Sequence, residues 1–305
     1  MGNAASQDQL PDAVAEWFTD PVDVHRQYRV LSALRSPVHP ARAFGALVEV
    51  LAALCATDRG RLGDPVSLNH VRSVVLAGGD RRVVKLSVQE AGDEMAALSG
   101  WDAKGLSGIS VPKVSAWGRT GDGILWTLQE FLPGSSLPSA GLHKVFSAAL
   151  GLAERLRLPA RDLPDGVEQL QNRLGFLLSS PESGRVVEEV TRRIQRLHGP
   201  RFTVHGNFSF ANLLEGPSGL SAVGAAGLVG FAASDPARLL AELLAEHVPE
   251  NPVLVDFLLD AASARIERFE LATLTAAELL CRTSAPASDA DATGWLVAAA
   301  EQCLR

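Results

Sequence analysis

The chain has 305 residues, 47% of them hydrophobic, and a formal net charge of −7. This length suffices for one large domain or two lobes, and the negative charge argues against general binding of nucleic acid. There is no apolar run long enough to predict a membrane span, no secretory signal, and no metal-type or disulfide pattern among the three cysteines. We therefore expect a cytoplasmic protein that binds neither nucleic acid nor membrane.

In the first part of the chain, the spacing of the apolar residues changes from a helical to a strand period. Residues 12–34 and 41–56 have helix-like spacing, and residues 59–65 are typical of a connector. Alternating apolar residues then predict two hairpins, separated by a short helix over residues 90–98. The predicted strands are residues 71–77, 82–87, 111–118 and 124–132.

After Pro133 and Gly134 the chain becomes mostly helical, with a strand-like stretch over residues 202–228. The predicted helices are residues 143–156, 167–178, 182–197, 237–246, 252–270, 275–282 and 290–304. This order predicts an α+β fold with a small antiparallel β lobe, which holds one helix, and a larger helical lobe. The expected domains are an N-terminal helical extension, residues 1–64, the β lobe, residues 65–133, and the helical lobe, residues 134–305.

Residues 205–212 read His-Gly-Asn-Phe-Ser-Phe-Ala-Asn. They resemble the catalytic loop, His-Gly-Asp-x-x-x-x-Asn, of the aminoglycoside and choline kinase-like phosphotransferase family. The resemblance implies a bilobal protein-kinase-like fold, with Asn207 beside His205 at the position of the catalytic Asp and Asn212 as a remaining metal ligand. A carboxamide cannot accept a proton from a substrate hydroxyl as a carboxylate does.

Residues 227–237 resemble the family's next motif, in which an apolar strand leads into Asp-Phe-Gly and then Gly-Asp-Pro-Ala at a helix start. Phe231 matches the Phe, and Asp235 before Pro236 is expected to cap the helix. In this alignment the magnesium-binding Asp falls on Gly230, so the family's metal site would have no intact ligand set. Another alignment would give Asp235 the metal role, but it leaves the helix start unmatched.

The same resemblance locates a nucleotide site in the β lobe. Lys85 matches the strand lysine that binds the ATP phosphates, and it is one of only four lysines in the chain. Glu94 matches its helical partner, with Glu90 as the alternative. The hinge, whose backbone would bind adenine, is assigned to Glu130, Phe131 and Leu132.

The loss of two carboxylates favours a pseudokinase that acts as a binding, scaffolding or regulatory subunit. We expect a protein or peptide partner, with a small-molecule ligand as the alternative, and weakened binding of ATP and magnesium, so that no cofactor is assigned. The resemblance implies one setting, because such chains occur beside a lyase in peptide-modifying assemblies of actinobacterial natural-product pathways. The alternative function is an active, ATP-dependent O-phosphotransferase for a small molecule or peptide, with a rearranged site.

Overall fold

The computed structural model describes residues 61–65, 71–75, 81–87, 92–119, 125–137, 142–177, 183–247, 253–283 and 290–305. The expected N-terminal helices lie outside these residues. The chain divides into two compact units, one made of Met1–Gly92 with Pro112–Leu132 and the other of Asp93–Val111 with Pro133–Arg305. The first holds an antiparallel sheet and the second is mostly helical, which confirms the predicted α+β class.

The first unit is built on one five-stranded sheet. Its strands are β1 (Arg61–Pro65), β2 (Val71–Val75), β3 (Arg81–Ser87), β4 (Val114–Arg119) and β5 (Leu125–Glu130), in the spatial order β1-β2-β3-β5-β4. The β2–β3 and β4–β5 pairs are antiparallel neighbours, as predicted. The prediction of a connector over residues 59–65 is wrong at β1, which pairs with β2. A strand at the edge of a sheet tolerates the proline that suggested a connector.

The second unit consists of helices and two small sheets. Its helices are α4 (Gly92–Ala103), α5 (Leu142–Leu156), α6 (Gly166–Gly175), α7 (Gly184–Ile194), α8 (Ser234–His247), α9 (Val253–Ser263), α10 (Arg268–Arg282) and α11 (Ala290–Cys303). One sheet has the order β10 (Gly219–Ala222), β9 (Leu213–Gly216), β6 (Ser135–Ser136). The other has the order β11 (Leu228–Gly230), β8 (Phe202–Val204), β7 (Leu158–Pro159).

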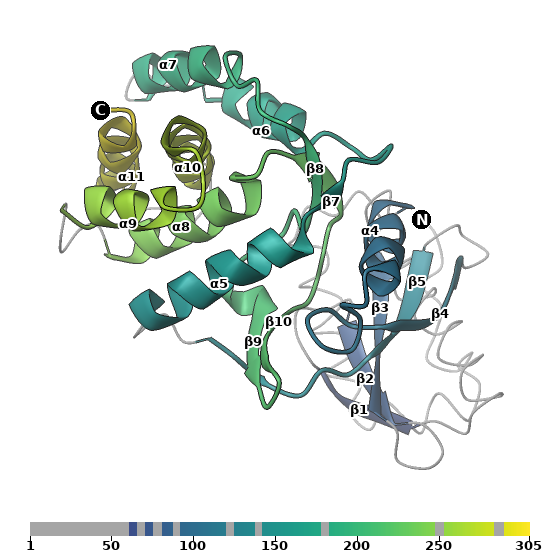
Figure 1. Ribbon diagram of the computed structural model, residues 1–305. Coiled ribbons are helices and arrows are strands. Elements are labelled where there is room, and N and C mark those ends of the chain that lie inside the picture. Colours follow the sequence, from purple (N-terminus) through teal and green to yellow (C-terminus); the bar gives the residue numbers. More distant parts are fainter. Residues whose placement is uncertain are drawn as a thin grey trace, which may run out of the picture. The chain divides into compact units, whose positions relative to one another are not determined.

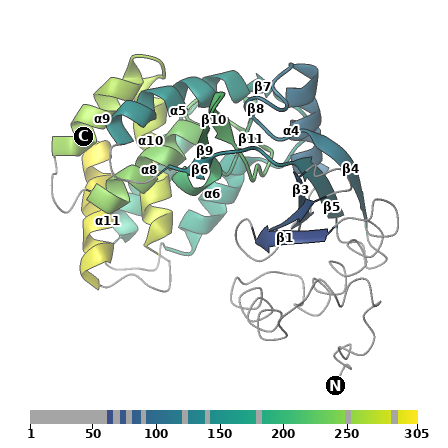
Figure 2. The same cartoon turned by 90° about the horizontal axis from the view of Figure 1, so that it is seen from below.

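Helix α10 forms the centre of the helical core. Figures 1 and 2 show α8, α9 and α11 around it, and α6 and α7 also pack against it. A continuous stretch of this helix, Glu270–Ala277, is buried. A helix buried on all sides lacks the polar face that gives an amphipathic helix its period.

For this reason the sequence pattern misplaced the boundary before α10. We predicted helices over residues 252–270 and 275–282, but the chain breaks after Ser263 and α10 begins at Arg268. Glu267 caps the new helix, because its carboxylate accepts hydrogen bonds from the backbone N–H groups of Phe269 (2.9 Å) and Glu270 (2.5 Å). Glutamate is not among the preferred N-cap residues, so no start signal is recognisable before Arg268.

Helix α4 groups with the helical unit, although the sequence pattern places it in the β lobe. The indole N–H of Trp101 donates to the carbonyl of Leu156 at 2.6 Å, and Trp101 is fully buried. The Lys104 ammonium donates to the carbonyls of Arg155 and Arg157. These bonds bind the end of α4 to the end of α5.

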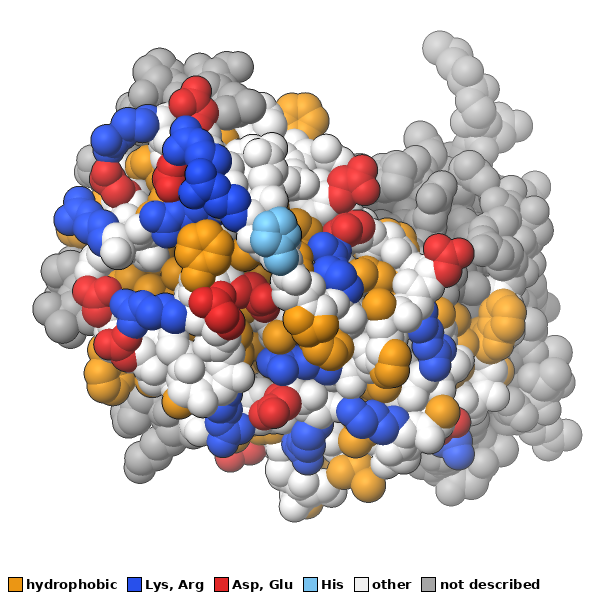
Figure 3. Space-filling view, turned by 45° about the horizontal axis from the view of Figure 1, so that its top comes forward, with side chains coloured by type: hydrophobic (Ala, Val, Ile, Leu, Met, Phe, Trp, Pro, Cys, Tyr) orange, Lys and Arg blue, Asp and Glu red, His pale blue; other side chains and the backbone are white. Residues whose placement is uncertain are grey.

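The described surface mixes charges of both signs. In the space-filling view, basic and acidic side chains lie interspersed (Figure 3), and pairs such as Arg173–Glu278 and Arg193–Glu189 join them. Exposed pairs of this kind contribute little stability. None of the described helices is both long and apolar enough to cross a membrane.

The Trp101 hydrogen bond yields a stability prediction. Trp101→Phe keeps most of the ring but leaves the Leu156 carbonyl without its donor, so it should lower the free energy of unfolding by about 1–3 kcal/mol. Urea unfolding followed by far-UV circular dichroism measures this. Trp295→Phe, at a tryptophan that is 43% exposed, is the control and should change it by less than about 0.5 kcal/mol. Equal losses in the two variants would contradict the assignment.

Candidate functional site

The loop that carries the sequence motif, residues 205–212, connects β8 to β9. It turns at Gly206, whose φ is +73°. A Cβ at this position would lie 2.8 Å from the Cγ of Leu228. Glycine is therefore required here both by the backbone conformation and by the close approach of β11.

One face of helix α8 holds this loop. The Asp235 carboxylate accepts the backbone N–H groups of His205 and Gly206, each at 2.8 Å and each on a different oxygen. Arg238 donates to the Gly206 carbonyl at 3.0 Å, and Glu242 accepts the backbone N–H of Phe210 at 3.1 Å. Residues 235, 238 and 242 lie on one side of a helix, so α8 contacts the loop through a single row of polar side chains.

Asp235 is 3% exposed, and burial raises its pKa to about 6. The hydrogen bonds from Gly206 and His205 and the charges of Arg238 and Arg157 act in the opposite direction but do not outweigh burial. Our expectation that Asp235 caps α8 is wrong, because its carboxylate binds the loop. The chain before α8 is instead held by Ser234, whose hydroxyl accepts from Phe231, and by Glu270, which accepts from Ala233.

The two asparagines of the motif use their amide N–H groups within the loop region. The side-chain N–H of Asn207 donates to the carbonyl of Gly224 at 3.0 Å, and that of Asn212 donates to the carbonyl of Asn207 at 2.8 Å. A carboxylate at position 207 would place two acceptors against each other, because an ionised Asp has no proton to donate. The amide at position 207 is thus a structural element of the loop.

The apolar spacer residues of the loop turn inward. Phe208 is fully buried and Phe210 is 4% exposed. The imidazole of His205, also fully buried, stacks with Trp101 at 6.0 Å between ring centroids and meets the edge of Phe208 at 5.6 Å. His205 therefore anchors the loop in the core of the helical unit.

The segment beside the loop is residues 223–227, which follow the β9–β10 hairpin. The carbonyl of His205 accepts the N–H groups of Ala226 and Gly227, and the carbonyl of Asn212 accepts that of Val223. A Cβ on Gly224 would lie 3.1 Å from Oδ1 of Asn212. The glycine that faces Asn212, the predicted metal ligand, is therefore Gly224.

Gly230 has other neighbours. It ends β11, and a Cβ there would lie 2.5 Å from the hydroxyl of Ser234 and 3.1 Å from Val204. An aspartate at this position would collide with the start of α8. Residues 216–234 contain no Asp or Glu, so the nearest acidic residues in the sequence are Glu215 and Asp235.

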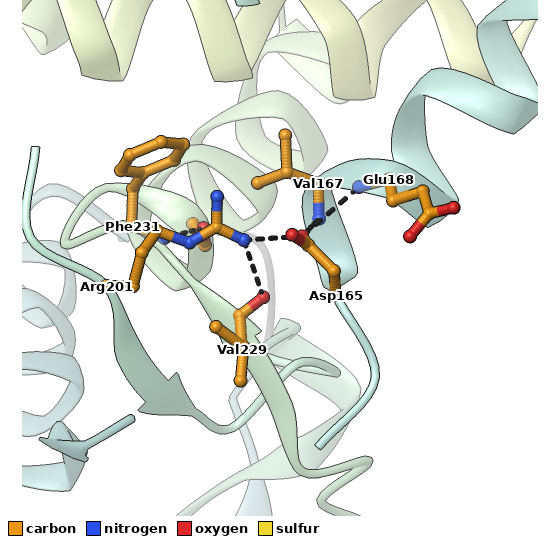
Figure 4. A network of polar contacts seen from close by, with 7 residues as sticks. Asp165, Val167, Glu168, Arg201, Val229 and Phe231 are labelled. Atoms are coloured by element: carbon orange, nitrogen blue, oxygen red, sulfur yellow. Dashed lines mark hydrogen bonds and ion pairs between the residues drawn. The ribbon is translucent and has the colours of Figure 1, made fainter. Parts of the chain in front are cut away.

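An arginine connects β8, which leads into the loop, with the neighbouring strand β11 and with α6 (Figure 4). Arg201, just before β8, donates to Asp165 at 2.5 Å and to the carbonyl of Val229 at 3.5 Å, and its guanidinium lies 4.4 Å from the ring centroid of Phe231. Asp165 in turn caps α6 by accepting from Val167 and Glu168. This network fixes β8, β11 and α6 together.

The predicted nucleotide-site residues lie in both units. Lys85 lies on β3, where its backbone is in register with Thr127 of β5. In the hinge segment, the N–H of Glu130 donates to the Lys113 carbonyl at 2.8 Å, Phe131 is half-buried and Leu132 is buried. Glu94 lies on α4 in the helical unit and is buried, while Glu90 lies outside the described residues. Pairing of Lys85 with Glu94 stays a prediction.

Reasoning from sequence missed Arg238, Glu242 and Gly224. The signal for the first two was available, because they follow Asp235 by three and seven residues, a spacing that places all three on one helical face. Gly224 was missed because the motif was aligned on Phe231. Among the described residues, no three His, Cys, Asp or Glu side chains are grouped so that they could hold a metal ion.

Solved structures similar to this chain include aminoglycoside phosphotransferases and a fructosamine kinase. Aminoglycoside phosphotransferase APH(4)-Ia aligns with a TM-score of 0.54 at 12% identity, over 85% of this chain and 98% of its own. The aminoglycoside phosphotransferase of Alicyclobacillus acidocaldarius gives 0.52 at 15% identity, over 79% and 89%. A putative fructosamine-3-kinase of Thermobifida fusca gives 0.51 at 18% identity, over 83% and 97%.

No protein-family profile and no curated protein sequence matches the chain. The structural likeness nevertheless confirms the predicted fold, which is the protein-kinase-like fold of the aminoglycoside phosphotransferases.

The raised pKa of Asp235 gives a pH prediction. Its ordinary value is 3.8 and its folded value is about 6, so between these pH values the folded state binds more protons than the unfolded state. The contribution of this carboxyl to the free energy of unfolding is therefore largest below pH 4. It decreases by about 3 kcal/mol as the pH rises through 6. Asp235→Asn removes the titration, so the stability difference between the wild type and this variant should fall by that amount from pH 4 to pH 7.

Urea unfolding of both proteins at each pH measures this difference. The contributions of the other titrating groups are the same in both proteins, so they cancel in the difference. A difference that stays constant or grows with pH would show that the two backbone hydrogen bonds outweigh burial, and it would contradict the assignment.

Proposed function

We propose that this chain, which has the fold of a phosphotransferase, no longer transfers phosphate and acts as a binding subunit. The observation that carries the proposal is the hydrogen bond from the Asn207 amide to the Gly224 carbonyl. The residue at the general-base position has become part of the loop's internal bonding. An amide that donates this bond cannot remove a proton from a substrate. A carboxylate at the same position would have no proton to donate to the Gly224 carbonyl.

The acidic side chains around the loop support the same conclusion. Asp235 and Glu242 both touch it, and both accept hydrogen bonds from its backbone. They hold the loop from the side of α8. Magnesium prefers carboxylates and phosphate oxygens in octahedral geometry, and beside the loop the chain offers the neutral carboxamide of Asn212 and the bare Gly224. The residues present do not fit a magnesium site of the phosphotransferase kind.

The second candidate function is an active phosphotransferase with a rearranged site, in which Asn212 or Asp235 holds magnesium. Retention of Asn212 and Lys85 favours it. Against Asp235 in this role stands its geometry, because each of its two oxygens already accepts a backbone N–H and the residue is buried. We therefore rank this function second.

For the setting of the binding role we propose the cytoplasm and, on the resemblance alone, a peptide-modifying assembly in which this chain works beside a lyase. The partner is then a protein or peptide. Purification of the chain from its native cells tests this setting: recovery of a lyase with it would support the assembly, and a chain that elutes alone would count against it.

Burial raises the pKa of the Cys281 and Cys303 thiols to about 12, so neither is expected to be reactive.

A nucleotide-binding experiment separates the two functions. If the metal site is lost, magnesium and ATP together should raise the thermal unfolding midpoint no more than ATP with a chelator does, because a ligand stabilises only through its binding to the folded state. The measurement is a thermal unfolding series with each addition. A magnesium-dependent increase that Asn212→Ala abolishes would favour the active phosphotransferase.

Restoring the acid should weaken the loop and should not restore transfer. Asn207→Asp sets a carboxylate against the Gly224 carbonyl, so we expect the free energy of unfolding at pH 7 to fall by about 1–3 kcal/mol. The loss should shrink below about pH 4, where the new carboxyl is protonated and can donate. Urea unfolding measures both.

Asn172→Asp makes the same chemical change at an exposed position of α6 and is the matched control, with an expected change below about 0.5 kcal/mol. If Asn207→Asp is as stable as the wild type and gains transfer from ATP, the structural role of the amide is refuted.

A further inference from the structure

A row of arginines lies along one side of helix α7 and of the turn that follows it. Positions 185, 189, 192 and 196 follow one another at intervals of three or four residues, so their side chains lie on the same side of the helix. Arg185, Arg192 and Arg196 are exposed, and Glu189 is half-buried. Where Figure 3 brings α7 forward, several basic side chains lie side by side. We propose that this row is the docking site for an acidic helical segment of a partner protein, which presents its carboxylates one helical turn apart.

Arg193 fixes the helix that carries the row. Its Nε donates to Glu189 at 2.9 Å, and its Nη2 donates to the carbonyl of Leu304, just after α11, at 2.6 Å. Its guanidinium also lies 5.6 Å from the ring centroid of Phe269, at the start of α10. One guanidinium thus uses both its N–H donors and its flat face. These contacts hold the end of α7 against α10 and α11, so the row lies on a fixed support.

The positive charge of the row exceeds the negative charge beside it. The guanidiniums of Arg192 and Arg193 share one carboxylate, that of Glu189. The hydrogen bond from Arg193 lowers the pKa of Glu189, and the charges of Arg192, Arg193 and Arg196 act in the same direction. Among the described residues, no side chain forms an ion pair or a hydrogen bond with the guanidinium of Arg196. Three arginines therefore surround one carboxylate, while Glu188, the other acid within α7, lies on the neighbouring side of the helix.

The spacing of Arg192 and Arg196 indicates the kind of partner. The two residues are four positions apart, about one helical turn, and a guanidinium binds a carboxylate through two parallel hydrogen bonds. A helical segment with Glu or Asp at the same interval therefore offers one carboxylate to each arginine. Phe269, which is 37% exposed beside Arg193, adds an apolar contact for the same segment.

Two other occupants fit the row less well. A nucleic acid needs a broad positive field, whereas the chain as a whole carries a net charge of −7. A second copy that used the same row in antiparallel orientation would set Arg185 against Arg196 at both ends, and like charges in such positions oppose association. The row therefore fits an acidic partner better than it fits a nucleic acid or another copy of this chain.

This inference deepens the proposed binding role and rests on it for its biological purpose, but the two can fail separately. A chain that transfers phosphate and still binds an acidic helix at α7 would lose the proposed function and keep the docking site. A chain that neither transfers phosphate nor binds there would lose the docking site alone.

The test uses the full chain and fluorescein-labelled, alanine-rich helical peptides with blocked ends. The aligned probe carries three Glu residues at intervals of four, the scattered probe carries them at intervals of five, and the basic probe has Lys in place of each Glu of the aligned probe. Fluorescence anisotropy at low salt should show the aligned probe binding about tenfold more tightly than the basic probe. It should bind about threefold more tightly than the scattered probe, whose carboxylates lie on different sides of the helix. A single-stranded oligonucleotide that displaces the aligned probe at a lower concentration than unlabelled aligned peptide does would overturn the proposal in favour of nucleic acid.

Variants locate the site. Arg192→Gln combined with Arg196→Gln should weaken binding of the aligned probe about tenfold or more, while Arg155→Gln, at an exposed arginine of α5, should leave it unchanged. Arg192→Glu combined with Arg196→Glu should make the basic probe the tighter binder, a reversal that a loss of folding cannot produce. The proposal is overturned if the aligned probe binds no better than the basic or the scattered probe, or if these variants bind as the wild type does. Sedimentation showing a dimer that the Glu variant dissociates would also overturn it, in favour of a second copy.

Discussion

The loop of residues 205–212 depends on one buried interaction, in which the Asp235 carboxylate binds the N–H groups of His205 and Gly206. The two bonds fix consecutive peptide groups from the first turn of α8, and Arg238 and Glu242 continue the same row along the helix. Because α8 packs against the central helix α10, the position of the loop is set by the core of the helical unit.

On the proposed function, this separation lets the fold keep the shape of a catalytic loop without its carboxylates. The bonds that shape the loop come from backbone groups, from α8 and from the buried His205, none of which performs the chemistry of transfer. At the tip, the Asn207 side chain donates to the Gly224 carbonyl, and the Asn212 side chain donates to the Asn207 carbonyl. On the proposed function, Asn207 bonds within the chain at the position where the family has its catalytic carboxylate.

The fold was predictable from the sequence where the local residue pattern is distinctive, and not where that pattern is absent. Alternation and turn residues predicted the strand pairs β2–β3 and β4–β5, and the motif at residues 205–212 predicted the fold. After the β9–β10 hairpin the alignment assigned the lost ligand to Gly230 by matching Phe231 to the aromatic of the family motif, whereas in the structure Gly224 lies against Asn212. The assignment of that position stays a prediction. The buried helix α10 was misjudged for a related reason, since a helix with no polar face gives no period.

The most direct test of the central claim is a crystal structure of the full chain grown with ATP and magnesium. We expect the Asn207 amide still to donate to the Gly224 carbonyl and no magnesium ion to lie within coordination distance of Asn212, about 2.1 Å. A magnesium ion bound to Asn212 together with a carboxylate of this chain, and bridging the nucleotide phosphates, would contradict the account.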